Sequence, residues 1–268
     1  MQTMVASITY KKTVRTPVGA RGPAISFHEC YFELVEPAAE ADVLACLYRK
    51  EPVAGWRSYP GATRLIDLRP EPERIFAGLP KDTRYEINRA REKDGIETSV
   101  ATAPGDLELE NFMDYYDAFA GSKGVPPVSR PQLLALHAAG KLALSFASSS
   151  GGALLASHAY ILDHDRARLT HSASLFRLEQ DARERGQIGR ANRLLHWNDA
   201  VTFRDRGVIC YDFGGWYEGH GDEALLRINS FKKEFGGEIV NEWSSFGAGS
   251  VVGSLYLTVR DLMLRTKR

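Results

Sequence analysis

Hydrophobic positions along the chain recur with two periods, about two residues and about 3.6 residues, which are typical of strands and helices. Strands are predicted at residues 5–15, 24–35, 63–69, 96–103, 141–148, 153–162, 167–174, 207–213 and 238–243. Helices are predicted at 38–50, 80–94, 106–124, 131–140, 189–206 and 222–235. From residue 104 the order is α-α-β-β-β-α-β-α-β, which predicts an α/β (α+β) fold on a mixed sheet.

The pattern also suggests how the chain divides. The first 80 residues are irregular and rich in glycine and proline, whereas the later elements follow one another closely. We therefore predict a partial N-terminal lobe with a linking helix at 1–95 and a second domain at 96–268.

Composition narrows the functional classes. The chain has 268 residues with 34 basic and 34 acidic side chains, so its formal net charge is zero and a strongly basic nucleic-acid binder is disfavoured. Three widely spaced cysteines and the absence of a signal-peptide pattern in the first residues lead us to expect a reduced, cytoplasmic protein.

A glycine-containing segment precedes the helix predicted at 189. It consists of Arg185, Gly186, Gln187, Ile188, Gly189, Arg190 and Ala191. Glycines let a backbone approach a ligand closely, and the N–H groups at a helix start attract anions, so a pyrophosphate would fit there. The alternative is a plain surface loop, since the glycine spacing matches neither the Walker pattern nor the G-x-G-x-x-G motif of nucleotide-binding folds.

Two histidines lie on consecutive predicted strands. If the turn at 163–166 is symmetric, His158 and His171 face each other across the strand pair. They would then form a base site or remain ordinary hydrogen-bonded histidines, and a one-residue slip would separate them. No third ligand at a recognisable spacing accompanies them, so we predict no metal.

Two further segments carry candidate chemistry. The strand at 207–213 ends in Asp212-Phe213-Gly214-Gly215, and open α/β sheets bind ligands at such ends, although a simple turn is the alternative. Near the end of the helix at 222–235, Lys232 lies beside an apolar face. On spacing alone we favour a role for Lys232 in complementing the helix C-terminus over projection into a cleft.

Three motifs in order resemble the FemAB-like branch of the GNAT acyltransferase superfamily. They are Arg84-x-x-Ile87-x-x-Ala90 with Gly95, then Tyr211-Asp212-Phe213-Gly214-Gly215, then Phe231-Lys232-x-x-Phe235-Gly236-Gly237. The resemblance covers residues 80–243 and implies a GNAT-like core preceded by a truncated or degenerate GNAT-like lobe. It also implies that the strands at 167–174 and 208–213 splay apart to admit an acyl donor.

The resemblance implies transfer of an acyl group, acetyl or aminoacyl, to an amine of a small molecule, sugar or cell-envelope precursor. The co-substrate is acyl-CoA, favoured by the segment 185–191, or aminoacyl-tRNA, favoured by the Phe-Lys-x-x-Phe-Gly-Gly element. Lys232 would stabilise the transition state, Asp212, His171 or a bridging water would accept the amine proton, and Tyr211 or Tyr217 would protonate the leaving group. We assign substrate contacts to Arg84, His158, Trp216 and Phe231.

The sequence also allows a second class of function, binding without catalysis. The C-terminal segment 250–268 is amphipathic and ends in Arg-Thr-Lys-Arg, so it either packs on its own domain or rests on a membrane surface. The alternative to an enzyme is thus a GNAT-like module that binds a glycan precursor or a membrane without catalysis.

Overall fold

The computed structural model describes residues 6–15, 21–33, 40–174 and 181–265, and it divides the chain into two compact units. The first unit comprises residues 1–61, 130–139 and 241–268, and the second comprises 62–129 and 140–240. The helix expected to link the two parts, at 80–94, and residues 62–67 before it belong to the second of these units.

The first unit is built on four strands in the order β1-β2-β3-β10. They are β1 (Ser7–Arg15), β2 (Arg21–Tyr31), β3 (Val43–Arg49) and β10 (Glu238–Ala248), of which β10 is shared with the second unit. Strands β2 and β3 pair in parallel, and the other two pairs are antiparallel. Within the described ranges the unit also contains two helices, α4 (Arg130–Ala138) and α7 (Val251–Arg265).

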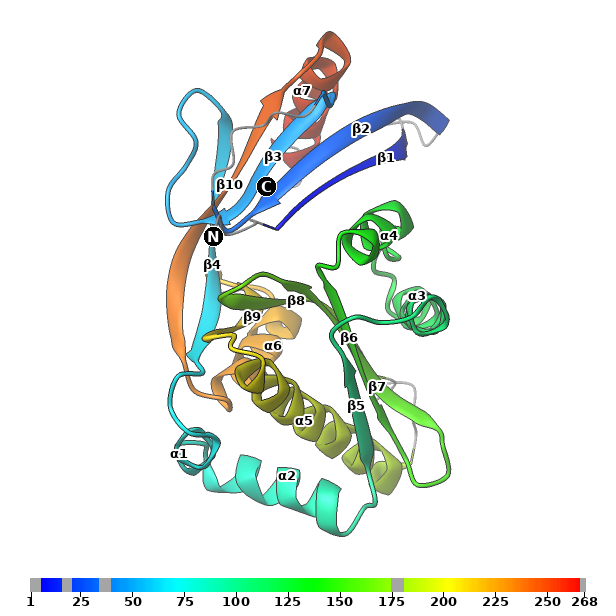
Figure 1. The fold of residues 1–268 in the computed structure, drawn as a ribbon, viewed down its shortest axis with the longest axis vertical. Helices are drawn as coiled ribbons and strands as arrows, with labels where there is room; N and C mark the ends of the chain where they lie inside the picture. Colours follow the sequence, from blue (N-terminus) through cyan, green and yellow to red (C-terminus); the bar gives the residue numbers. More distant parts are fainter. Residues whose placement is uncertain (1–5, 16–20, 34–39, 175–180, 266–268) are drawn as a thin grey trace. The chain divides into compact units, whose positions relative to one another are not determined.

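The second unit has the strand order β4-β9-β8-β7-β6-β5 (Figure 1). The strands are β4 (Arg57–Asp67, of which 62–67 lie in this unit), β5 (Glu97–Ala101), β6 (Leu142–Ser148), β7 (Leu154–Leu162), β8 (Arg166–Ser174) and β9 (Cys210–Trp216). Strands β8 and β9 pair in parallel, and the other neighbouring strands of this unit pair antiparallel. The predicted α/β class with a mixed sheet is confirmed.

The described residues of the second unit form five helices. They are α1 (Pro72–Ala77), α2 (Lys81–Glu92), α3 (Asp106–Lys123), α5 (Ala182–Asp205) and α6 (Glu223–Lys233). Asp181 and Asp222 cap α5 and α6, each accepting two backbone N–H groups, which explains where these helices begin. Helices α3 and α5 cover opposite faces of the strands β6–β8 (Figure 1). No helix in the described ranges has the length and apolar character needed to cross a membrane.

The core of the second unit lies between α5 and the sheet. Leu194, Leu195 and Phe203 of α5 are at most 1% exposed and pack against buried residues of β7, β9 and α2. Burying one such side chain contributes about 1.5–3 kcal/mol. The core therefore fixes the face of α5 that is turned toward the sheet.

One predicted element has the wrong type. Residues 38–50 were expected to be helical, but 43–49 form the strand β3, paired with both β2 and β10. A short apolar run fits a buried helix and a buried strand equally well, and here the hydrogen bonds of two neighbouring strands decide. The ends of the runs predicted at 5–15, 24–35 and 38–50 extend to residues outside the described ranges.

The predicted pairing of His158 with His171 is also wrong. The β7–β8 register is symmetric as far as Tyr160↔Leu169 and then shifts, so that Ala159 pairs with His171 and His158 pairs with Ser172. Thr170 is the extra residue of a β-bulge, and its hydroxyl donates to the Ala159 carbonyl at 3.0 Å. The two histidines consequently lie on opposite faces of the sheet.

Candidate active site

Strands β8 and β9 hydrogen-bond only where they begin. Their paired residues are Arg166–Arg168 with 210–212, whereas β8 continues to Ser174 and β9 to Trp216. Just beyond this pairing, Gly214 has φ +70°, and a Cβ there would lie 2.7 Å from the Leu169 carbonyl oxygen. A side chain at position 214 would therefore collide with β8 and force the two strands apart where their backbones now approach closely.

A cavity of about 660 Å³ opens where the two strands diverge. Its lining includes Leu169, Ser172 and Ser174 of β8 and Phe213 of β9. Phe119 of α3 and residues of α5 and α6 complete it, so helices on both faces of the sheet contribute to the walls. The gap predicted between these strands is confirmed.

Asp212 ties the two strands together below the cavity. Its carboxylate accepts from Arg168 Nη1 and Arg166 Nε, each at 2.8 Å, and also from the Thr63 hydroxyl and the Gly214 N–H. Burial alone would raise the pKa of Asp212, but the two guanidinium groups and these hydrogen bonds hold it below its usual value. Both carboxylate oxygens are engaged, so the geometry supports a positioning role rather than proton acceptance.

Lys232 reaches into the cavity from α6. Its side chain is 8% exposed, and Nζ donates to the carbonyl oxygens of Gly215 at 2.5 Å and Gly214 at 3.2 Å. Burial lowers the pKa of Lys232 from 10.5 to about 8, and the nearby charge of Asp212 opposes this effect. These bonds go to β9 and not to the end of its own helix, so the interpretation favoured on spacing alone is wrong for Lys232.

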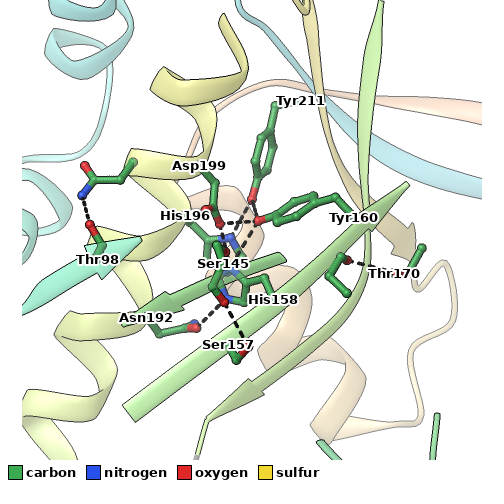
Figure 2. Close-up of polar contacts among 12 residues, drawn as sticks. Thr98, Ser145, Ser157, His158, Tyr160, Thr170, Asn192, His196, Asp199 and Tyr211 are labelled. Atoms are coloured by element: carbon green, nitrogen blue, oxygen red, sulfur yellow. Dashed lines mark hydrogen bonds and ion pairs between the residues drawn. The ribbon is translucent and has the colours of Figure 1, made fainter. Parts of the chain in front are cut away.

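A buried polar network lies behind the cavity wall, between α5, β7 and β9 (Figure 2). His196 is 2% exposed and lines the cavity, and its Nδ1 lies 2.7 Å from the Tyr211 hydroxyl. That hydroxyl is 2.8 Å from the Tyr160 hydroxyl, which donates to Asp199 Oδ2 at 2.5 Å. His158 Nδ1 lies 2.8 Å from the same carboxylate oxygen, and the His158 and His196 rings stack at 4.0 Å.

The network also brings possible metal ligands together. His158, His196 and Asp199 each offer a ligand atom within 4.8 Å of the others. Asp199 Oδ2, however, already accepts hydrogen bonds from Tyr160 and His158, and His196 Nδ1 bonds Tyr211. We therefore interpret the cluster as a hydrogen-bonded network.

Most residues of this network were not predicted as site residues. The missed residues are Tyr160 of β7, His196 and Asp199 of α5, and also Asn192 of α5, whose Oδ1 lies 2.9 Å from His158 Nε2. The signal was present, because residues 192, 196 and 199 recur at spacings of four and three and share one helix face. A polar stripe on a face that must pack against a sheet requires partners there.

The segment 185–191 is not a loop. Helix α5 begins at Ala182, so these seven residues lie inside its first turns, and their backbone N–H groups are in position for helical hydrogen bonds. Asp181 already accepts from Arg183 N and Glu184 N, which fills the anion-binding end of the helix with the protein's own carboxylate. The prediction that 185–191 form a loop is thus wrong, although Gly189 does line the cavity. Residues 175–180 are outside the described ranges.

The other predicted site residues are dispersed. Phe231 lines the cavity, as expected. His171 instead packs edge-on against Tyr116 of α3 with ring centroids 4.8 Å apart, and burial lowers its pKa to about 4.

The remaining predicted contacts are not among the residues that line the cavity. The Arg84 side chain donates to the Ala77 carbonyl at 3.2 Å. Trp216 lies below the Arg64 guanidinium, and the Tyr217 hydroxyl accepts from Asp222 N at 3.3 Å. Among the described residues, their contacts are therefore with other parts of the second unit.

No protein-family model matches the sequence, and no curated protein matches it. Among solved structures, FemX is similar, with a TM-score of 0.59 and 11% identity over 88% of each chain. The C-terminal domain of a putative lysylphosphatidylglycerol synthetase from Agrobacterium fabrum gives a TM-score of 0.55 and 12% identity over 94% of this chain and 89% of that one. L-PGS from Bacillus licheniformis gives 0.51 and 12% over 93% and 88%. These likenesses confirm, at the level of the fold, the FemAB-like GNAT resemblance.

Proposed function

We propose that the protein transfers an acyl group from a thioester or ester to an amine, in the cavity between β8 and β9. The observation that carries the proposal is the buried ammonium of Lys232 at the point where these strands diverge. An amine that attacks an acyl carbon creates an oxyanion, and a preorganised cation in a water-poor site stabilises it strongly.

The hydrogen bonds of Lys232 suggest how it would act. An ammonium has three N–H groups, and two of them fit the carbonyl oxygens of Gly214 and Gly215. These two bonds fix the nitrogen, and the third N–H is assigned to the oxyanion of the reacting acyl group. Loss of one such donor typically reduces kcat by about 10²–10³-fold.

The donor is either an acyl-CoA or an aminoacyl-tRNA. The helical state of 185–191 removes the loop that favoured acyl-CoA. One structure with this fold is named as the C-terminal domain of a putative lysylphosphatidylglycerol synthetase, and because this name includes an amino acid and a lipid, it supports testing aminoacyl donors. The acceptor is an amine of a small molecule, sugar or cell-envelope precursor.

The test is product formation from labelled donors. The full chain is incubated with radiolabelled acetyl-CoA, or with a mixture of radiolabelled aminoacyl-tRNAs, and with polyamine, amino-sugar and aminolipid acceptors. We expect an acylated amine from one donor class, with RNase abolishing the reaction only if tRNA is the carrier. Lys232→Met should reduce turnover about 10²-fold or more, and Lys233→Met, at the exposed neighbouring position, should not. Absence of product from every pair would contradict the proposal.

One observation favours a second candidate function, membrane-surface binding by the first unit. Helix α7 exposes apolar side chains, with Val251, Leu255 and Leu262 at 87%, 66% and 57%. Its Arg260 and Lys12 of β1 line the same apolar pocket, so cations accompany the apolar surface. Co-sedimentation with anionic vesicles tests this. Leu255→Ser with Leu262→Ser should release the protein, whereas Leu107→Ser on α3 should not.

A further inference from the structure

The hydrogen-bond chain behind the cavity has a defined direction. It runs from His196 through Tyr211 and Tyr160 to the Asp199 carboxylate (Figure 2). A carboxylate only accepts, and each tyrosine hydroxyl has one hydrogen to donate. Because the Tyr160 hydrogen goes to Asp199, the Tyr160 oxygen must receive the hydrogen of Tyr211.

This direction fixes the state of the histidine at the cavity. The Tyr211 hydrogen is used on Tyr160, so at 2.7 Å the Tyr211 oxygen accepts from His196, which places a hydrogen on Nδ1. In a neutral imidazole the other nitrogen, Nε2, then carries a lone pair. No hydrogen bond to Nε2 is found within the part of the chain that the structure describes.

The surroundings of His196 favour this neutral form. Burial lowers the pKa of His196 well below its usual value, and the charges of His158, Lys232 and Arg193 act in the same direction. Phe213, Phe231 and Phe235 surround the ring with centroids 4.9–5.5 Å away. His196 thus lines the cavity with a ring that is held in one orientation and whose Nε2 carries no proton.

Resting on the acyl transfer proposed above, we propose that His196 is the general base that accepts the proton of the acceptor amine. Tyr211, Tyr160 and Asp199 are positioning residues, which hold the ring and its tautomer through the hydrogen-bond chain. The positive charge that develops on His196 is stabilised through the two hydroxyls by the carboxylate at the end of the chain.

The reaction balances with the two substrates alone. The amine nitrogen bonds to the acyl carbon, and the carbonyl electron pair moves to the oxygen, which Lys232 stabilises. One proton passes from the nitrogen to His196 Nε2. The carbonyl then re-forms, the carbon–sulfur or carbon–oxygen bond breaks, and the leaving thiolate or alkoxide takes that proton from His196, leaving an amide and a free thiol or alcohol.

The tautomer can be measured without any substrate. Long-range ¹H–¹⁵N NMR of the ¹⁵N-labelled full chain at neutral pH distinguishes protonated from unprotonated imidazole nitrogens, and comparison with His196→Gln assigns the signal. We expect a hydrogen on Nδ1 and none on Nε2. In Tyr211→Phe, which removes the acceptor, we expect a mixture of tautomers, whereas Tyr85→Phe at an exposed position should change nothing. A hydrogen on Nε2 in the wild type overturns the proposal.

Kinetics test the proton transfer itself, with the donor and acceptor that give product. His196→Ala should lower kcat by about 10²–10⁴-fold with little change in KM, and added imidazole should restore part of it. His220→Gln, at an exposed loop histidine, is the matched control. Turnover in His196→Ala within a few-fold of the wild type, or no rescue by imidazole, overturns the base. If His196→Ala does not fold, His196→Gln is measured in its place.

The two proposals fail in different ways. If no donor and acceptor pair reacts with the wild type, acyl transfer fails, and the base assignment fails with it whatever the tautomer. If transfer occurs but His196→Ala retains it, only the base assignment fails.

Discussion

Replacing Lys232 by methionine tests the electrostatic basis of the site. Folding moves the pKa of this ammonium from 10.5 to about 8, chiefly through burial. Between these two values the unfolded chain binds a proton that the folded chain has released, so the stability of the wild type rises with pH. At about pH 9.5 the folded lysine is about 1.5 pH units above its pKa, and the unfolded one is still protonated. This contributes about 2 kcal/mol relative to pH 7, at about 1.36 kcal/mol per pH unit.

The assay is urea unfolding of the wild type and Lys232→Met at about pH 7, 8, 9 and 9.5. The free energy of unfolding of the wild type, minus that of the variant, should increase by about 2 kcal/mol over this range. Taking the difference removes the titration of groups that both proteins share. The exposed Lys233→Met serves as the control, and the increase for Lys232→Met should exceed any change in the difference for Lys233→Met. A flat difference for Lys232→Met would refute the buried ammonium and, with it, its proposed role.

Three further outcomes are expected. Gly214→Ala should destabilise the protein by about 1–3 kcal/mol, because the φ of Gly214 is +70° and a Cβ would lie 2.7 Å from a β8 carbonyl oxygen. As the control, Gly215→Ala should have a free energy of unfolding within about 1 kcal/mol of the wild type, because no atom lies within 4 Å of its Cβ. Asp212→Asn should lower the free energy of unfolding by about 3–5 kcal/mol, because Arg168 would stay buried without its carboxylate; a loss below about 1 kcal/mol in urea unfolding would contradict this account. With an acceptor amine that is unprotonated throughout, kcat should fall as the pH rises through about 8, because the Lys232 ammonium loses its proton.

Local patterns predicted the second unit well. The helix after Pro80, the strands around the turns at 151–152 and 163–165, and the helix near 222–235 all occur close to their expected positions. Their signals are local, consisting of period, caps and turn residues. The strand at 43–49 was missed because its neighbours come from residues 27–31 and 243–248, which no local pattern relates to it.

The site was predicted only in part. Lys232 and Phe231 follow from a motif, and both line the cavity. His196 was missed, although its helix was predicted. Its place in the site depends on its hydrogen-bond chain, which includes Tyr211 from a strand and Asp199 from one turn further along the helix. Such a network is a property of tertiary packing, and only the spacing of polar residues along α5 hints at it.

The single extra residue at Thr170 has a consequence for how the cavity tolerates change. Compared with a regular strand in which Thr170 were paired, the bulge exchanges the faces of all residues that follow it in β8. Ser172 and Ser174 thereby point to the cavity and His171 to α3. The bulge thus decides which side chains form the cavity wall. Regular pairing of Thr170 with Ala159 would place His171 opposite His158 and turn the serines toward α3, whereas deletion of Thr170 would leave Ser172 paired with His158.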